Sequence, residues 1–157
     1  MTLLHLHIDV CADIEWLVEA LDEAEEGSER IRRALAEPAV LAYAASVADQ
    51  RVAALVMRWD TDESEIVYVA VQPAVRGKGI GKAIVLWSVA EARRRGVASV
   101  IVGTGNCSLD NIAFYQKCGF RMHAVKRDYF AYIDPPVVEN GILLRDMLVF
   151  KIDLVAR

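Results

Sequence analysis

The glycine-spaced segment 71–82, which reads V-Q-P-A-V-R-G-K-G-I-G-K, constrains the fold of this chain most strongly. It stands between a β-branched run that predicts a strand and an apolar-periodic stretch that predicts a helix. Glycines let backbone N–H groups approach an anion without interference from Cβ, and a helix start adds unpaired N–H donors and a positive dipole end. The segment therefore predicts a phosphate- or pyrophosphate-binding turn at the head of a helix, with a turn that serves only packing as the alternative.

Two common phosphate-binding motifs do not fit this spacing. The P-loop pattern G-x-x-x-x-G-K-[ST] would place Arg76 at its first glycine and Ala83 at its magnesium-binding hydroxyl. The dinucleotide pattern G-x-G-x-x-G would place Lys82 or Ile84 at its last glycine. Both a nucleoside triphosphatase and a dinucleotide-binding fold are therefore disfavoured.

The remaining patterns indicate one α/β domain over residues 1–157. A chain of 157 residues, of which 55% are hydrophobic, is enough for a single core. The order of elements expected from periodicity and turn signals is β-α-α-β-β-β-α-β-α-β-β. The expected elements are a strand around 4–8, helices at 14–21 and at 28–36 with Ser28 as the cap, three antiparallel strands within 40–71, a helix from 82 to about 95, a strand at 99–104, a helix at 109–118, and strands at 120–125 and 143–151.

Charge and cysteine usage exclude several classes of protein. A net charge of −4 argues against a nucleic-acid binder and favours a neutral or cationic partner. Three cysteines without a C-x-x-C spacing indicate neither a disulfide framework nor a zinc site, and His5 and His7 share a strand face without a third metal ligand. The longest uncharged apolar run, 39–45, is too short for a bilayer span, and no secretory signal is recognisable. We therefore expect a cytoplasmic protein that binds no membrane.

Two motifs carry a resemblance to a known family. Residues 76–81, R-G-K-G-I-G, fit the Q/R-x-x-G-x-G/A loop by which GNAT N-acetyltransferases hold the pyrophosphate of acetyl-CoA. Residues 106–120, N-C-S-L-D-N-I-A-F-Y-Q-K-C-G-F, resemble the family's second signature, with a departure in spacing. The resemblance spans nearly the whole chain, and residues 103–150 are similar to one bacterial subgroup of unassigned substrate. It implies the GNAT fold, an α/β (α+β) architecture with a mixed, mostly antiparallel central sheet of about seven strands flanked by about four helices.

The resemblance also implies acetyl-CoA as cosubstrate, without a metal. Backbone groups of the strand before the loop, the loop itself and polar side chains near the second signature correspond to the family's cofactor contacts. These residues are Val69, Ala70, Val71, Arg76, Gly77, Lys78, Gly79, Ile80, Gly81, Lys82, Asn106, Asn111 and Lys117.

The implied reaction is transfer of an acetyl group to a primary amine by direct attack in a ternary complex. Tyr115 stands where the family's general acid stands, and an aromatic that only packs against the sheet is the alternative. Glu65 matches the catalytic glutamate of the histone-acetyltransferase branch, and a solvated carboxylate is the alternative. The other candidate bases are Asp62, Glu63, Asp128 and Glu139.

The sequence leaves the acetyl acceptor open between a small molecule and a protein that bears an amine. Acidic clusters at 22–26 and 60–65 favour a cationic amine. The aromatic residues considered for its pocket are Trp59, Tyr68, Tyr129, Phe130 and Tyr132. A non-catalytic module that binds acetyl-CoA or another acyl-CoA is the competing function, and a ping-pong mechanism through Cys107 is a minor alternative. Family analogy suggests a homodimer.

Overall fold

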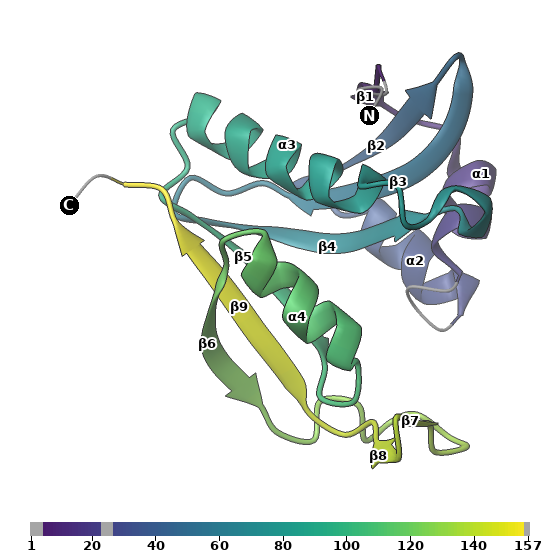
Figure 1. The fold of residues 1–157 in the computed structure, drawn as a ribbon, viewed down its shortest axis with the longest axis vertical. Coiled ribbons are helices and arrows are strands. Elements are labelled where there is room, and N and C mark those ends of the chain that lie inside the picture. Colours follow the sequence, from purple (N-terminus) through teal and green to yellow (C-terminus); the bar gives the residue numbers. More distant parts are fainter. Residues whose placement is uncertain (1–4, 23–26, 156–157) are drawn as a thin grey trace.

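A seven-stranded sheet in the order β1-β2-β3-β4-β5-β9-β6 forms the centre of the computed structural model, which describes residues 5–22 and 27–155 (Figure 1). Strands β4 and β5 are parallel, and every other neighbouring pair is antiparallel. The predicted mixed, mostly antiparallel sheet of seven strands is therefore confirmed. Its strands are β1 (His7–Val10), β2 (Val40–Val47), β3 (Gln50–Arg58), β4 (Glu63–Val71), β5 (Ser99–Gly105), β6 (Arg121–Lys126) and β9 (Met147–Asp153).

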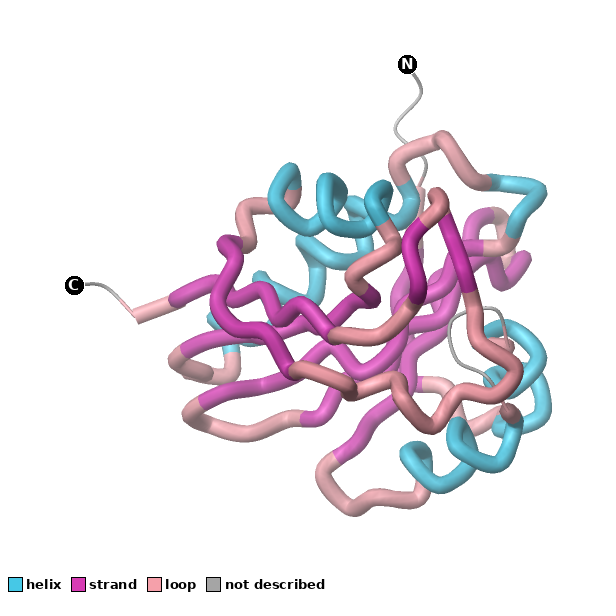
Figure 2. The backbone as a smooth tube through the Cα atoms, turned by 90° about the horizontal axis from the view of Figure 1, so that it is seen from below, coloured by secondary structure: helices cyan, strands magenta, loops and turns pink. Residues whose placement is uncertain are grey.

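Within the described residues, four α-helices cover the two faces of this sheet (Figure 2). Helices α1 (Ile14–Leu21) and α2 (Ser28–Leu35) pack on one face, and α3 (Ile80–Arg94) and α4 (Leu109–Lys117) pack on the other. In α1 the buried residues Leu17 and Leu21 are one turn apart, so one side of the helix is apolar. Asp13 caps the same helix by accepting a hydrogen bond of 3.2 Å from the Trp16 N–H.

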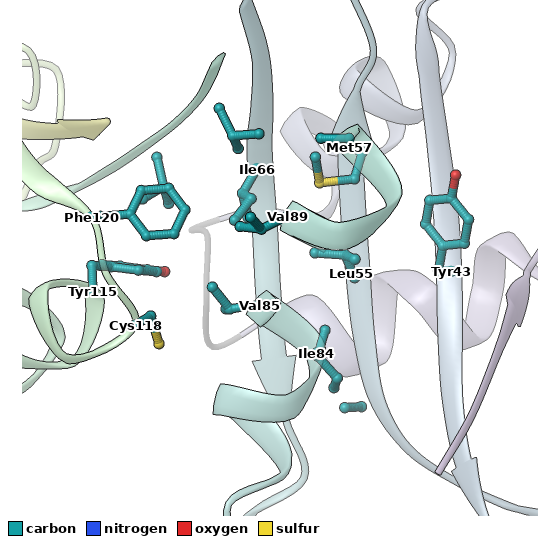
Figure 3. Close-up of a cluster of buried hydrophobic side chains, with 14 of the residues drawn as sticks. Tyr43, Leu55, Met57, Ile66, Ile84, Val85, Val89, Tyr115, Cys118 and Phe120 are labelled. Atoms are coloured by element: carbon teal, nitrogen blue, oxygen red, sulfur yellow. The ribbon is translucent and has the colours of Figure 1, made fainter. Parts of the chain in front are cut away.

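Side chains of β3 divide the core into two clusters because they alternate between the faces of the sheet. Leu55 and Met57 lie beneath α3 and α4, whereas Ala54 and Val56 lie beneath α1 and α2. The larger cluster, drawn in Figure 3, includes Tyr115 of α4 and residues of α3. Both helical layers are therefore fixed to the sheet by buried apolar surface.

Three local expectations were wrong in detail. Gly27, with φ of 95°, occupies the N-cap position of α2, so Ser28 opens that helix and does not cap it. The last strand begins at Met147, and a short hairpin of β7 (Val138–Glu139) and β8 (Ile142–Leu143) precedes it. The first strand begins at His7, and Leu4 of its expected pattern lies outside the described residues. The acidic residues Glu23, Glu25 and Glu26 also lie outside them.

The parallel joint between β4 and β5 is short and opens into a gap. It consists of four residue pairs, and the last of them joins Ile66 to Val102. Beyond that pair the two strands diverge, and Figure 1 shows β4 and β9 running apart from a common region. Val67 has no partner in β3, because Tyr68 pairs with Val56 and Ile66 with Met57. This bulge and the divergence together leave residues 67–71 with one edge open to the gap.

Candidate active site

The open edge of β4 presents alternate backbone groups to the gap. The Gln72 N–H donates to the Val52 carbonyl at 2.9 Å, which shows that Gln72 faces β3. In an antiparallel ladder both backbone groups of a residue point the same way, and the direction alternates along the strand. Val69 and Val71 therefore face the gap, whereas Ala70 faces β3, unlike the expectation that all three would contact a cofactor. A hydrogen bond of 3.0 Å from Arg76 Nε to the Val71 carbonyl agrees with this assignment.

The glycine turn after β4 ends in an uncapped helix start. Gly77 and Gly79 have φ of 80° and 82°, which L side chains rarely adopt. Gly79 is the N-cap residue of α3 and makes no side-chain capping bond. The next three N–H groups, those of Ile80, Gly81 and Lys82, have no carbonyl partner within the helix. The turn therefore offers several N–H donors together with the positive end of the α3 dipole.

This turn and the open edge of β4 belong to one continuous site. A Cβ atom at Gly81 would lie 3.6 Å from Phe114 Cζ and 3.6 Å from Val71 Cγ2. The start of α3, the end of β4 and one side of α4 thus meet at Gly81. The two sequence motifs, which are separated by a helix and a strand, are brought into contact here.

Three exposed basic residues, Arg76, Lys78 and Lys82, lie in the turn or in the first helical turn of α3, and Lys117 is exposed at the end of α4. Lys82 is close enough to Cys118 for its charge to lower the pKa of that thiol, although burial is the larger effect and the net pKa is raised. These side chains add positive charge around the N–H donors, which suits a phosphate group.

Tyr115 of α4 lies in the core cluster beneath α3 and α4 and is only 6% exposed. Its ring packs against Phe114, Phe120 and Phe150 with centroid distances of 5.2, 6.1 and 6.1 Å. In Figure 3 the ring extends from α4 toward α3, with the hydroxyl on the side of Val85. Burial, with a smaller contribution from Cys118, raises the pKa of Tyr115 to about 12. The phenol is therefore a protonated hydrogen-bond donor at neutral pH.

The two asparagines of the second motif have different surroundings. Asn106 Oδ1 accepts hydrogen bonds from the backbone N–H groups of Arg145 and Asp146, at 2.9 and 3.0 Å, and its Nδ2 donates to the Leu143 carbonyl at 3.0 Å. Its amide thus holds the segment that leads into β9, which differs from its expected role in cofactor binding. Asn111 is exposed on α4 and donates to Thr104 Oγ1 at 3.3 Å.

Glu65 is held in a network of charges on the face of α1 and α2. Arg58 Nη1 donates to Glu65 Oε1, and the same guanidinium donates to Glu37 through Nε at 2.9 Å and Nη2 at 3.1 Å. The hydrogen bond with Glu37 is the main cause of the raised pKa of Arg58, and the charge of Glu65 contributes to it. Glu65 is therefore an anchored carboxylate.

Three of the four alternative carboxylates, those of Glu63, Asp128 and Glu139, are also engaged. Glu63 Oε2 lies 3.4 Å from Lys151 Nζ at the closed end of the β4–β5 joint. Asp128 accepts from Arg145 Nε at 2.8 Å. Glu139 accepts a hydrogen bond of 3.5 Å from the hydroxyl of Ser108 and faces the Cys107 thiol, which lies 3.9 Å away. None of these pairs places its carboxylate on the open edge of β4.

The cysteines are buried thiols, and the part of the chain that the structure describes contains no cluster of metal ligands. Cys11, Cys107 and Cys118 are free and buried. Burial, and then the charge of Glu139, raises the pKa of the Cys107 thiol, which disfavours the thiolate that a ping-pong mechanism needs. Within 5–22 and 27–155, no three His, Cys, Asp or Glu side chains are grouped as metal ligands. No helix in the same part of the chain is long and apolar enough to cross a membrane.

The aromatic residues proposed for an acceptor pocket fall into two groups. Tyr129, Phe130 and Tyr132 form one cluster, with successive ring centroids 5.0 and 6.5 Å apart. The Arg30 guanidinium of α2 lies 3.8 Å above the Tyr132 ring, so the segment after β6 reaches across to α2. Trp59 packs with the core cluster beneath α3 and α4, and Tyr68 packs with the cluster beneath α1 and α2.

Comparison with known proteins identifies the family. The sequence model described as the acetyltransferase (GNAT) family matches residues 8–120. The chain belongs to the GNAT family. The match begins in β1 and ends just after α4, so it includes both the glycine turn and the second motif of this GNAT domain.

Individual GNAT proteins resemble the chain over different lengths. An uncharacterized N-acetyltransferase of Bacillus subtilis, YvbK, is 42% identical over 91 residues, which span 57% of this chain and 59% of YvbK. A Bacillus subtilis acetyltransferase solved in complex with CoA is 32% identical, with a TM-score of 0.86 and coverage of 96% of this chain and 99% of that one. A GNAT acetyltransferase of Elizabethkingia anophelis with acetyl-CoA bound is 27% identical, with a TM-score of 0.87 and coverage of 95% and 98%. The match to the curated relative thus covers about three fifths of its length, whereas the structural matches are nearly complete.

Proposed function

We propose that this GNAT domain transfers the acetyl group of acetyl-CoA to a primary amine by direct attack in a ternary complex. The observation that carries the proposal is the gap between β4 and β5, whose open edge at Val69 and Val71 leads directly into the glycine turn. Solved GNAT relatives of nearly the same length hold CoA or acetyl-CoA, which supports this cosubstrate.

The proposed cofactor contacts follow the geometry of the site. The N–H groups of 77–82 bind the pyrophosphate, assisted by Arg76, Lys78, Lys82 and Lys117. The pantetheine arm runs along the gap-facing groups of Val69 and Val71 and adds, in effect, a strand to β4. Asn111 borders the same gap from α4 and is the proposed partner of a pantetheine amide. Asn106 is left out of this set because of its structural hydrogen bonds.

In the proposed reaction the amine nitrogen forms a bond to the thioester carbon, and the carbon–sulfur bond breaks. The gap-facing N–H groups at Val69 and Val71 stabilise the oxyanion that develops on the carbonyl. Glu65 accepts the proton of the amine through a water molecule, and Tyr115 donates a hydrogen bond to the departing thiolate. A phenol with a pKa of about 12 is a weak acid, so Tyr115 acts by holding its hydrogen bond to sulfur as the negative charge develops there.

A calorimetric titration of acetyl-CoA, beside CoA and ATP, tests the cofactor site. We expect micromolar binding of acetyl-CoA and no binding of ATP alone. Thiol release from acetyl-CoA in the presence of a panel of primary amines then tests the reaction. Folded protein that fails to bind acetyl-CoA would contradict the proposal, and binding without amine-dependent thiol release would favour a non-catalytic module.

We further propose that the protein acts in the cytoplasm as a homodimer. Its free cysteines agree with a reducing compartment.

Strand β6 ends the sheet with all six residues exposed, including Met122 at 64% and Val125 at 56%, which supports pairing of this edge with a second copy. Light scattering after gel filtration should give twice the mass of the 157-residue chain. A monomer at micromolar concentration would contradict the dimer.

A further inference from the structure

The strands beside the gap have a second face, opposite α3 and α4. The apolar cluster beneath α1 and α2 contains residues of β2, β3 and β4 but, within the described residues, none of β5 or β9. Val100 and Val102 of β5 point into the cluster beneath α3 and α4. Because side chains alternate along a strand, Ile101, Gly103 and Gly105 line the opposite face. A molecule that reaches a thioester held in the gap from this side passes over those three residues.

Two of the three residues on that face are glycines, and each holds a side chain against its backbone. A Cβ atom at Gly103 would lie 2.5 Å from Met147 Sδ, and one at Gly105 would lie 2.5 Å from Leu144 Cδ1. Neither glycine has a positive φ, so the residue type is explained by space and not by backbone conformation. Met147 is directly opposite Gly105 in the β5–β9 ladder, and its side chain leans diagonally onto Gly103.

Aromatic side chains border the same place. A Cβ atom at Gly105 would lie 3.8 Å from Phe130 Cε2, so this ring stands beside Leu144. Tyr132, which follows in the Phe130 cluster, lies under the Arg30 guanidinium of α2. We call the surface formed by Gly103, Gly105, Met147, Leu144 and Phe130 the acceptor chamber. Its walls are apolar, although the net charge of the chain is −4.

We propose that Met147 and Leu144, seated on Gly103 and Gly105, set the size of the acceptor chamber, and that the acceptor carries an apolar or aromatic group next to its primary amine. This inference rests on the proposed acetyl transfer. Both seated side chains are half-buried, so they remain available to a bound molecule. A thioether chain and an isobutyl group have no polar atom that would bind a hydroxyl or a second ammonium, so a polyamine gains nothing there.

The first test changes the depth of the chamber. For Met147→Ala we expect the ratio of kcat/KM for phenethylamine to that for methylamine to rise by about tenfold, since small changes in an apolar pocket are worth about that factor. Comparing one ratio between variants cancels the different basicities of the two amines. Val10→Ala is the control, because Val10 lies on β1 at the far edge of the sheet and is 63% exposed. Equal ratios in the two variants would overturn the inference.

The second test changes Gly103, against which the Met147 side chain packs. Gly103→Ala should push the Met147 side chain into the acceptor chamber and lower kcat/KM for phenethylamine by about tenfold, with a smaller effect on methylamine. The double variant Gly103→Ala with Met147→Ala should recover phenethylamine turnover, because the added methyl group then occupies the vacated space. Thermal unfolding of each variant establishes that it is folded. A double variant no better than Gly103→Ala would overturn the inference.

Failure of the inference and failure of the proposed function give different results. If the protein binds acetyl-CoA and acetylates amines regardless of their apolar group, the inference about the acceptor chamber is contradicted. The proposed acetyl transfer is then retained. If neither methylamine nor phenethylamine releases thiol from bound acetyl-CoA, the proposed function is contradicted, and the inference falls with it.

Discussion

Arg58 and Glu65 are direct partners in the β3–β4 ladder, and the Arg58 guanidinium binds the Glu65 carboxylate while it also holds Glu37 beyond the end of α2. A carboxylate near the start of a strand is ordinarily solvated. The position of Glu65, two residues before the bulge at Val67, is instead fixed by Arg58. The network therefore fixes Glu65 directly before the Ile66–Val102 pair, after which the gap begins.

We expect Glu65→Gln to lower kcat by about a hundredfold, in the usual range for loss of a general base. The affinity for acetyl-CoA should not change, because Glu65 lies outside the glycine turn and the open edge of β4. Glu37→Gln is the control, since it weakens the other side of the same guanidinium. Thiol-release assays of both variants measure these losses. Equal losses in the two variants would assign Glu65 a structural role.

Tyr115→Phe distinguishes an enzyme from a cofactor-binding module. We expect kcat to fall by about a hundredfold or more, while calorimetry gives the same Kd for acetyl-CoA, because only a proton donor is removed. Tyr43→Phe removes a hydroxyl from another buried tyrosine of the same core cluster and serves as the control. Full turnover in the Tyr115 variant would show that the ring only packs.

The raised pKa of Tyr115 predicts a specific loss of stability in alkali. The neutral phenol is favoured in the folded state, so between an unfolded pKa of 10.0 and a folded pKa of about 12 the unfolded chain binds fewer protons. The free energy of unfolding therefore falls as pH rises above 10, by up to about 2–3 kcal/mol from this residue. Urea unfolding of the natural chain and of Tyr115→Phe at pH 9 and near pH 11 measures the difference, which should shrink with pH. A pH-independent difference would contradict the burial of an intact phenol.

Gly79→Ala should combine two losses. A left-handed φ of 82° costs an alanine about 1 kcal/mol of stability, and the displaced turn should also weaken acetyl-CoA binding by about tenfold. Gly96, at the other end of α3 with φ of 75°, provides the matched control. Gly96→Ala should lose the same stability without any change in Kd. Thermal unfolding and calorimetry on both variants give the two quantities, and equal affinities would remove the turn from the cofactor site.

The local elements could be predicted because their causes are local. The glycine turn, the end of α3 at Gly96 and the antiparallel strands within 40–71 depend on neighbouring residues and turn chemistry. The cap at Ser28 was wrong for a related reason: Ser28 and Gly27 both suit a helix start, and the choice between them depends on how the chain enters α2.

Several contacts of the site could not be predicted from the sequence, because they join residues that are far apart in the chain. β9 lies between β5 and β6, so the last strand of the chain separates two strands that precede it. That placement brings Leu143, Arg145 and Asp146 to the Asn106 amide, which the motif alone had assigned to a cofactor. Met147 on Gly103 is likewise a pairing between residues far apart in sequence. A glycine inside a predicted strand is the one available signal, since it often marks a close approach.

The four-pair joint between β4 and β5 makes cohesion of the protein depend on its ligand. One half-sheet contains β1 to β4 and the other contains β5, β9 and β6, and a molecule lying in the gap touches both. A ligand bound in the gap therefore holds the two half-sheets together beyond the Ile66–Val102 pair. At a hundredfold excess over Kd this linkage amounts to about 2.7 kcal/mol, so the protein's resistance to heat and proteolysis would follow the acyl-CoA supply around it.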